Sequence, residues 1–310
     1  MIRASLFSAL LAIPGFAPLA LDPVKLEFKH LEGTSSTANS ASKVHQILNI
    51  AGMDIETKVD NKVTVTSTVG KRSSDGRLPI QEKIESLAVE LSLPGGVTVE
   101  FDSTNPNAKS DNPMIQALLD TYKARVGSTY SIVLGPDNKV ITVEGTDSIL
   151  KNASPSAAEL LRGELNPEHI KKAAQQGYDM LPTGPVSKGD TWTRTTVTRI
   201  GGGQTLTFET KFEYAGTVDR DGKKLDKITS AATSVTYSMD PDAPTPLKVT
   251  QSDLKIDSSK ATILFDREKG RSVQSTSVTR IVGDMTLNIN GMDFPSKLDL
   301  TFDSTSILQK

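Results

Sequence analysis

The chain of 310 residues contains no cysteine. Disulfide bonds and thiolate metal sites are therefore excluded, and so is the lipid anchor that bacteria attach to an N-terminal cysteine. A chain of this length is long enough to bury a sizeable core. We expect the packing of that core, rather than cross-links, to hold the fold together.

Aromatic residues and clusters of basic residues are also scarce. Aromatics make up 5% of the chain, the net charge is −2, and no run of Lys and Arg is interleaved with aromatic residues. Nucleic-acid binding depends on such cationic clusters, so nucleic acid is not an expected partner. With 36% hydrophobic and 23% charged residues, the composition is that of a globular protein.

Long apolar runs are absent except at the N-terminus. Arg3 precedes an apolar stretch, residues 4–21, which Pro14 and Gly15 interrupt and Asp22 ends. This pattern is typical of a secretory signal peptide, whereas a membrane anchor would need a longer stretch without proline. We therefore expect residues 1–21 to be a signal peptide, and the protein to be periplasmic or extracellular in a bacterium. After cleavage, no stable membrane anchor is expected.

No complete catalytic or metal-binding motif is present. His30, His45 and His169 are far apart and lack ligand partners at metal-binding spacing. No serine lies in a Gly-x-Ser-x-Gly elbow, and the Ser-x-x-Lys pattern at Ser40 lacks the Lys-Thr-Gly motif that accompanies it in penicillin-binding enzymes. We expect no enzyme activity, no metal and no cofactor, although two carboxylates meeting in a cleft would escape a motif search.

The chain does contain an internal repeat. Residues 47–60 and 286–299 are identical at eight of fourteen aligned positions, and both read as strand, glycine turn and strand. A weaker similarity relates residues 82–93 to 226–237. These similarities indicate repeated β-hairpins in two related halves.

Apolar residues alternate with polar ones in most of the chain. This period of two is typical of strands with one buried face. Examples are Leu206, Phe208, Phe212 and Tyr214, and near the C-terminus Leu298, Leu300 and Phe302. The predicted fold class is mainly β, with internally repeated antiparallel hairpins that form a strongly curved sheet or open barrel.

A few helices are expected in the centre of the chain, packed on the sheet. Asn112, Ser154 and Asn166 each precede a proline, which is a typical helix start. The helices are expected to end near Gly127, residue 162 and residue 176. They either pack on the curved sheet as structural elements or form a lid over a cavity.

The segment 182–185, Pro-Thr-Gly-Pro, separates the two halves. We expect a single β-rich domain over residues 22–310, made of one half at about 22–181, which includes the helices, and another at about 186–310. The alternative is two packed β units that divide at this segment.

The stretch 188–192, Lys-Gly-Asp-Thr-Trp, and the strand-turn-strand unit 131–143 resemble a family of exported bacterial β-rich proteins known only as a domain of unknown function. The resemblance covers most of the chain after the signal peptide. It implies Thr-rich hairpins and a central helical insert, and it implies no activity. Some such proteins are similar to lipoproteins, but this chain has no cysteine, so membrane anchoring is not implied.

Two functions fit these observations. The first is an exported soluble protein that binds an apolar ligand or protein segment between the curved sheet and the helices, by analogy with periplasmic lipid carriers. The alternative is a structural or protein-interaction module of the cell envelope. The residues expected to line the ligand site are Met114, Leu118, Tyr122, Leu161, Tyr178 and Trp192.

Overall fold

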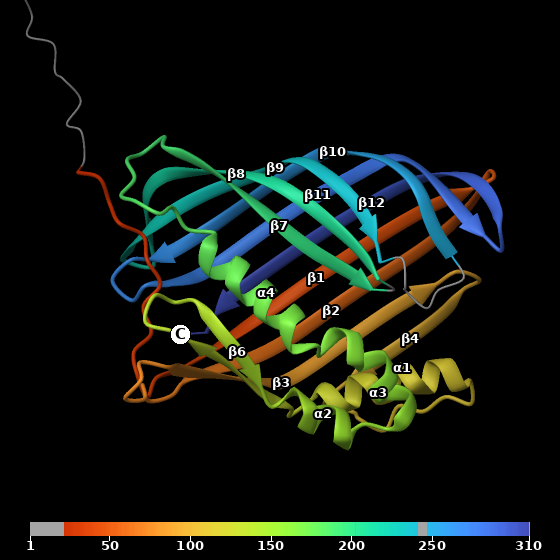
Figure 1. Cartoon of the computed structure of the whole chain (residues 1–310), viewed down its shortest axis with the longest axis horizontal. Helices are drawn as coiled ribbons and strands as arrows, with labels where there is room; N and C mark the ends of the chain where they lie inside the picture. Colours follow the sequence, from red (N-terminus) through yellow and green to blue (C-terminus); the bar gives the residue numbers. More distant parts are fainter. Residues whose placement is uncertain (1–21, 202, 241–246, 310) are drawn as a thin grey trace, which may run out of the picture.

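A computed structural model describes residues 22–201, 203–240 and 247–309; the expected signal peptide lies outside these ranges. The described residues form one 12-stranded antiparallel sheet with helices packed on it (Figure 1). In chain order, the strands before the helical region are β1 (Ser35–Ile50), β2 (Met53–Val69), β3 (Leu78–Leu93), β4 (Val97–Asp102), β5 (Thr129–Leu134) and β6 (Val140–Glu144). Those after it are β7 (Thr191–Gly201), β8 (Gln204–Arg220), β9 (Lys223–Met239), β10 (Leu247–Asp266), β11 (Arg271–Ile289) and β12 (Met292–Leu308).

The sheet is open, with β6 at one edge and β7 at the other. Its order is β6-β5-β3-β2-β1-β12-β11-β10-β9-β8-β7, and β4 pairs separately with β3. Because β1 pairs with β12, strands from both predicted halves lie in the same sheet. The predicted fold class is therefore confirmed: the protein is mainly β, antiparallel and open.

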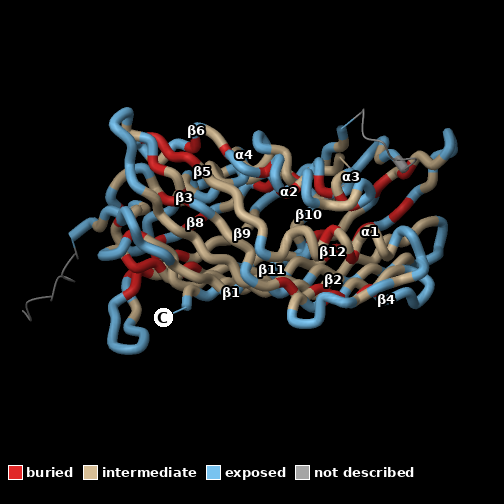
Figure 2. The backbone as a smooth tube through the Cα atoms, turned by 90° about the horizontal axis from the view of Figure 1, so that it is seen from below, coloured by how far each residue is buried: buried red, intermediate tan, exposed pale blue. Residues whose placement is uncertain are grey.

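The helices are α1 (Pro113–Arg125), α2 (Thr146–Asn152), α3 (Pro155–Glu164) and α4 (Pro167–Asp179). Asn112, Ser154 and Asn166 cap α1, α3 and α4 by accepting backbone N–H bonds, as the sequence predicted. Helix α2 was not predicted, because the residue before it, Gly145, makes no side-chain cap. In Figure 2, α2, α3 and α4 lie on one side of the molecule, and β1 and β2 lie on the other.

The repeated hairpins form the tips of β1–β2 and β11–β12, which are neighbours in the sheet. In the first copy, Asn49 Nδ2 donates to Asp54 Oδ1 at 2.7 Å and the Gly52 amide donates to Asn49 Oδ1 at 3.2 Å. In the second copy, Asn288 donates to Asp293 at 2.7 Å and the corresponding glycine amide donates to Asn288 at 3.1 Å. The repeated asparagine therefore holds the turn in both copies.

The two faces of the sheet differ in chemistry. We call inner the face that contacts the helices; it carries buried residues such as Leu298 and Leu300. The outer face carries ion pairs in solvent, for example Lys43 with Asp60 at 2.8 Å and Arg280 with Asp299 at 2.7 Å. An apolar inner face and a charged outer face are the pattern of an antiparallel sheet with one side in water.

One end of the curved sheet is filled by the segment before β1. Leu26 is buried with Phe265 in one core cluster, and the ring of Phe28 packs edge-on against Phe265 and Tyr178 at 5.6 and 5.5 Å. The Lys29 amide donates to Gly270 O at 2.9 Å, which attaches this segment to the turn between β10 and β11. The segment before β1 therefore covers the inner face at this end of the sheet.

Candidate functional site

Helix α4 spans the gap between the two edges of the sheet (Figure 1). On one side, Gln175 Oε1 accepts from the Val140 amide of β6 at 2.8 Å. On the other, Gln176 pairs with the backbone of Val197 in β7, accepting from its N–H and donating to its carbonyl. Two consecutive glutamines thus replace the strand pairing that a closed sheet would have at this seam.

The C-terminal end of α4 is fixed to β7 by side chains. Trp192 Nε1 donates to Met180 O at 2.8 Å, and Arg194 donates to Asp179 O at 2.5 Å and to Leu181 O at 2.6 Å. A cation that bonds the last carbonyls of a helix also interacts favourably with the helix dipole. Helix α4 is therefore held at the opening of the curved sheet.

Beneath the helices, much of the apolar inner face is only half-buried. Val44, Leu48, Leu254, Ile256 and Phe302 pack beside the buried residues of β8, β9, β11 and β12, yet each stays partly accessible to solvent. In Figure 2, long stretches of the central strands have this intermediate burial. The inner face is therefore an apolar surface that the protein's own side chains do not cover completely.

The middle of this face carries small side chains. Ser40 Oγ bonds Ser306 Oγ, and Ser277 Oγ bonds Ser304 Oγ, both at 2.8 Å. By strand alternation, Ser304 and Ser306 share the inner face with Leu300 and are too short to reach the helices. Ser304 is exposed, although it lies on the inner side of the sheet.

On β3, one charged residue, Glu82, interrupts the inner face. Ser36, Ser67, Glu82 and Tyr130 lie directly opposite one another on β1, β2, β3 and β5, and form a polar row on this face. Ser67 Oγ donates to Glu82 Oε2 at 2.7 Å. The neighbouring rows are apolar: Val69, Ile80 and Ile132 on one side, Val65 and Ile84 on the other.

Burial dominates the electrostatics of this polar row. It raises the pKa of Glu82, and the hydrogen bond from Ser67 opposes this only in part. Burial, followed by the negative charge of Glu82, raises the pKa of Tyr130 and that of Tyr178 in α4 to about 12. We call Ser67, Glu82, Tyr130 and Tyr178 the Glu82 cluster.

The Glu82 cluster has spare hydrogen-bonding capacity. Among the described residues, neither tyrosine hydroxyl has a hydrogen-bond partner, and Glu82 makes one side-chain hydrogen bond and no ion pair. The neighbouring His30 packs edge-on against Tyr178 at 5.6 Å, and its buried Nε2 has no partner. Burial, and then the charge of Arg72, lower the pKa of His30. Such a cluster can donate and accept hydrogen bonds with the polar group of a ligand.

The structure separates the six residues that the sequence analysis assigned to the ligand site. Met114 is exposed, Leu118 is half-buried, and Leu161 is buried among the helices. Tyr122 packs on Phe101 in the cluster formed by β3, β4 and α1, while Trp192 stacks on Phe212 at 5.6 Å. Tyr178 alone belongs to the Glu82 cluster, and Tyr122, Trp192 and Tyr178 pack in three different apolar clusters.

The sequence analysis missed Glu82, although a signal for it exists. Leu78, Ile80, Glu82 and Ile84 alternate along β3, so Glu82 occupies a position where the pattern calls for an apolar residue. A charged residue on the apolar side of a strand is unfavourable unless it has a role or a partner. Tyr130 carries no such signal, because tyrosine is common on half-buried strands.

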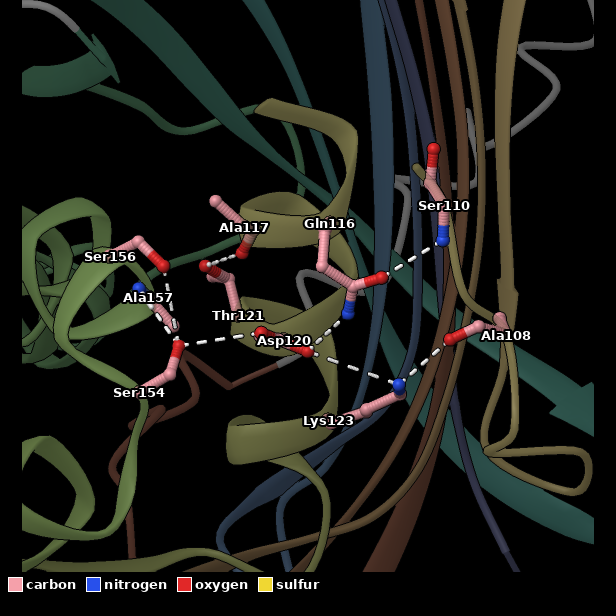
Figure 3. A network of polar contacts seen from close by, with 10 residues as sticks. All are labelled: Ala108, Ser110, Gln116, Ala117, Asp120, Thr121, Lys123, Ser154, Ser156 and Ala157. Atoms are coloured by element: carbon pink, nitrogen blue, oxygen red, sulfur yellow. Dashed lines mark hydrogen bonds and ion pairs between the residues drawn. The ribbon is translucent and has the colours of Figure 1, made fainter. Parts of the chain in front are cut away.

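A second polar network joins α1 to its neighbours, and its role is structural (Figure 3). Asp120 accepts from Gln116 Nε2 at 2.7 Å and from Ser154 Oγ at 3.4 Å, and lies 3.9 Å from Lys123 Nζ. Lys123 also donates to Ala108 O at 2.8 Å. Since Ser154 caps α3, the network attaches α3 and the loop before α1 to that helix.

The sheet also opens between β9 and β10. Although these strands have 17 and 20 residues, they pair only from Asp226 to Ser230 and from Ala261 to Phe265. Beyond this ladder, Ser259 Oγ accepts from the Ala232 amide at 2.9 Å. Residues 231–239 and 249–260 therefore lack a strand partner at this seam.

Two hollows lie elsewhere on the surface. A hollow of about 660 Å³ lies near the repeated hairpin tips and is lined by residues of both faces, among them Asn49, Asp253, Met285 and Ser296. Another, of about 440 Å³, lies over β3 and β4. Within the described residues, no group of three or more His, Asp or Glu side chains is placed to hold a metal ion. No helix in the same part of the chain is long and apolar enough to cross a membrane.

The fold and the site define a class of protein: an open, curved antiparallel sheet, with helices over an incompletely covered inner face. A family model described as a family of unknown function (DUF6263) matches residues 75–270. Since this match covers more than half of the chain, the protein belongs to that family. The expectation of a family of unknown function is confirmed. Among curated proteins there is no match.

Several solved structures are similar to this chain at a low level. Lipovitellin, in a structure titled for its lipid–protein interactions, has 9% identity and a TM-score of 0.42; the match covers 91% of this chain and 26% of that one. DynF from the dynemicin pathway of Micromonospora chersina has 8% identity, a TM-score of 0.21, and coverage of 96% and 92%. OpdQ of Pseudomonas aeruginosa has 6% identity, a TM-score of 0.22, and coverage of 89% and 99%. At these scores the likenesses carry no argument about function.

Proposed function

We propose that the protein binds a small molecule with a large apolar part, held on the inner face between the sheet and the helices. The observation that carries the proposal is the half-burial of Leu48, Leu254, Ile256 and Phe302 on that face. Removing apolar surface from water contributes about 25 cal/mol per Å². An apolar ligand in this place therefore stabilises the folded protein as it binds.

Export is part of the proposal, because residues 1–21 have the composition of a signal peptide. The protein then acts as a soluble carrier or receptor in the periplasm or outside the cell. N-terminal sequencing of the protein from its own cells tests this expectation. A mature chain that begins close to residue 22 supports export, and a chain that keeps residues 1–21 contradicts it.

Native mass spectrometry of the full mature chain tests ligand binding. The expected result is a bound cellular ligand that organic solvent removes. The emptied protein should then bind a fluorescent apolar probe such as 1-aminoanthracene, seen as the added mass of the probe. A mature chain that takes up neither a cellular ligand nor this probe would contradict the proposal.

A matched pair of variants locates the binding. Ser304 lies on the inner face and its neighbour Asp303 on the outer face, and both are exposed. Ser304→Trp fills inner space and is expected to lower probe affinity about tenfold, whereas Asp303→Trp leaves it unchanged. Equal effects of both variants would place the probe elsewhere.

The split between β9 and β10 favours a second function, the binding of an extended protein segment of the cell envelope. Backbone groups without a strand partner can pair with an added strand. Hydrogen exchange with and without an envelope extract tests it. Protection confined to residues 231–239 and 249–260 supports this function, and unchanged exchange there contradicts it.

A further inference from the structure

The polar row on the inner face points to the chemistry of the ligand's polar end. Glu82 is the residue that decides it, because it is the carboxyl group that lies between two apolar rows of this face. Its Oε2 accepts from Ser67 at 2.7 Å, which leaves Oε1 available. A buried carboxylate is stable when it is paired with a cation or well hydrogen-bonded.

The cations in this region are committed elsewhere. The next residue along β3, Lys83, points to the outer face and pairs with Glu85 at 2.7 Å. Arg125, whose charge acts on Tyr130, pairs with Glu164 at 3.5 Å. Arg72 donates to Gly76 O at 2.6 Å. Among the described residues, the protein therefore supplies no ion-pair partner for Glu82.

The groups around Glu82 suit a cationic ligand group. Tyr130 lies directly opposite Glu82 on β5, and Tyr178 approaches from α4, close enough for the Glu82 charge to act on both hydroxyls. An ammonium group is stabilised by a carboxylate and by the faces of aromatic rings, and a hydroxyl can accept its third hydrogen. A carboxylate or phosphate ligand would meet the charge of Glu82 instead.

Partly exposed apolar side chains adjoin the Glu82 cluster. Val63, Val65 and Ile84 lie on the same face, one and two rows further along β2 and β3, and all are half-buried. A chain that starts at Glu82 can run along these side chains toward the serines in the middle of the sheet. The carboxyl group and the apolar side chains thus lie one after the other along the face, as the polar head and the apolar chain do in an amphiphile.

We propose that the ligand is an amphiphilic amine, whose ammonium group pairs with Glu82 between Tyr130 and Tyr178 while its chain lies along Val65 and Val63. This inference rests on the proposed function and adds the ligand class to it. The residues specific to it are Glu82, Ser67 and Tyr130.

Three probes with the same chain length test the inference: dodecylamine, dodecanol and dodecanoate. Their affinities for the full mature chain are measured by displacement of 1-aminoanthracene at neutral pH. Wild-type protein is expected to bind dodecylamine at least about tenfold more tightly than dodecanoate, because a charge-assisted bond replaces a repulsion. Glu82→Gln is expected to remove this preference and to leave the affinity for dodecanol unchanged.

Two further variants control for a change in folding. Glu85→Gln alters the neighbouring outer-face carboxyl and should bind all three probes as the wild type does. Ser67→Ala leaves the side-chain volume at this position almost unchanged. It should weaken dodecylamine binding, but by less than Glu82→Gln does. An amine preference that survives in Glu82→Gln would overturn the inference.

The outcomes separate this inference from the proposed function. If all three probes bind equally to wild type and Glu82→Gln, the apolar binding function stands and the amine inference is overturned. If none of the three binds, the proposed function fails and the inference fails with it.

Discussion

Gln175 and Gln176 are adjacent in sequence, yet they hydrogen-bond to opposite edges of the sheet. Gln175 accepts from Val140 of β6 at 2.8 Å, and Gln176 pairs with Val197 of β7. An exposed strand edge is a site of unwanted pairing between chains. Helix α4 therefore has two roles: it protects both edges, and it brings Tyr178 to the inner face.

This arrangement predicts the effect of removing either glutamine. Gln175→Ala and Gln176→Ala should each lower the free energy of unfolding by about 1 kcal/mol, the usual worth of a hydrogen bond. Hydrogen exchange should show faster exchange at the Val140 amide in the first variant and at Val197 in the second. Lys172→Ala, an exposed change on the same helix, is the control. Unchanged protection of Val197 in Gln176→Ala would contradict the proposed role of α4.

An ion pair with a buried carboxylate, at the filled end of the sheet, predicts a larger loss of stability. Asp226 is 2% exposed; it accepts from Tyr214 Oη at 2.6 Å and pairs with Arg267 at 2.5 Å. Asp226→Ala leaves the Tyr214 hydroxyl without its partner, while the Arg267 side chain, 38% exposed, can be solvated. Urea unfolding should therefore show a loss of about 1–3 kcal/mol. Asp299→Ala breaks the exposed pair with Arg280 and should cost far less. Equal losses in Asp226→Ala and Asp299→Ala would contradict the argument that burial of Asp226 makes its contacts more important for stability.

The repeated hairpins predict a stabilising substitution. Both turns need positive φ at two positions: Ala51 and Gly52 have φ of 50° and 89°, and Asn290 and Gly291 have 53° and 85°. Alanine is strained in this region, whereas asparagine tolerates it. Ala51→Asn should therefore raise the free energy of unfolding by about 0.5–1 kcal/mol.

The second hairpin supplies the reciprocal test. Asn290→Ala should lower the free energy of unfolding by a similar amount, measured by the same thermal or urea unfolding. A lower free energy of unfolding in Ala51→Asn would show that the two turns are not equivalent.

The partial burial of Glu82 predicts a dependence of stability on pH. Because burial raises the pKa of Glu82 above its ordinary value of 4.5, the folded protein keeps this proton at a pH where the unfolded chain has lost it. Glu82 therefore costs stability as pH rises from 4.5 through the raised value, and no further cost arises above it.

The Glu82→Gln variant measures this effect directly. Its free energy of unfolding should equal that of the wild type at low pH and exceed it at neutral pH. Glu85→Gln should not show this gain, since a hydrogen bond from Lys83 lowers the pKa of Glu85. A difference that does not change with pH would contradict the burial of Glu82.

The sequence predicted the local features of the fold well. Strand alternation, the helix caps at Asn112, Ser154 and Asn166, and the glycine turns depend on neighbouring residues, so they are visible in a single chain. Helix α2 escaped because it has no side-chain cap. The six residues that the sequence analysis assigned to the ligand site were chosen as apolar or aromatic side chains near helices. This criterion says nothing about their positions relative to one another.

By itself, the sequence determined the antiparallel hairpins, the equivalence of the first and last of them, and the absence of cross-links, because each follows from local backbone geometry or composition. Only the tertiary structure decided that α4 bridges β6 and β7, and that Glu82, Tyr130 and Tyr178 meet on the inner face. These contacts join segments that are far apart in the chain. Their register depends on the pairing and curvature of the whole sheet, which no local pattern specifies.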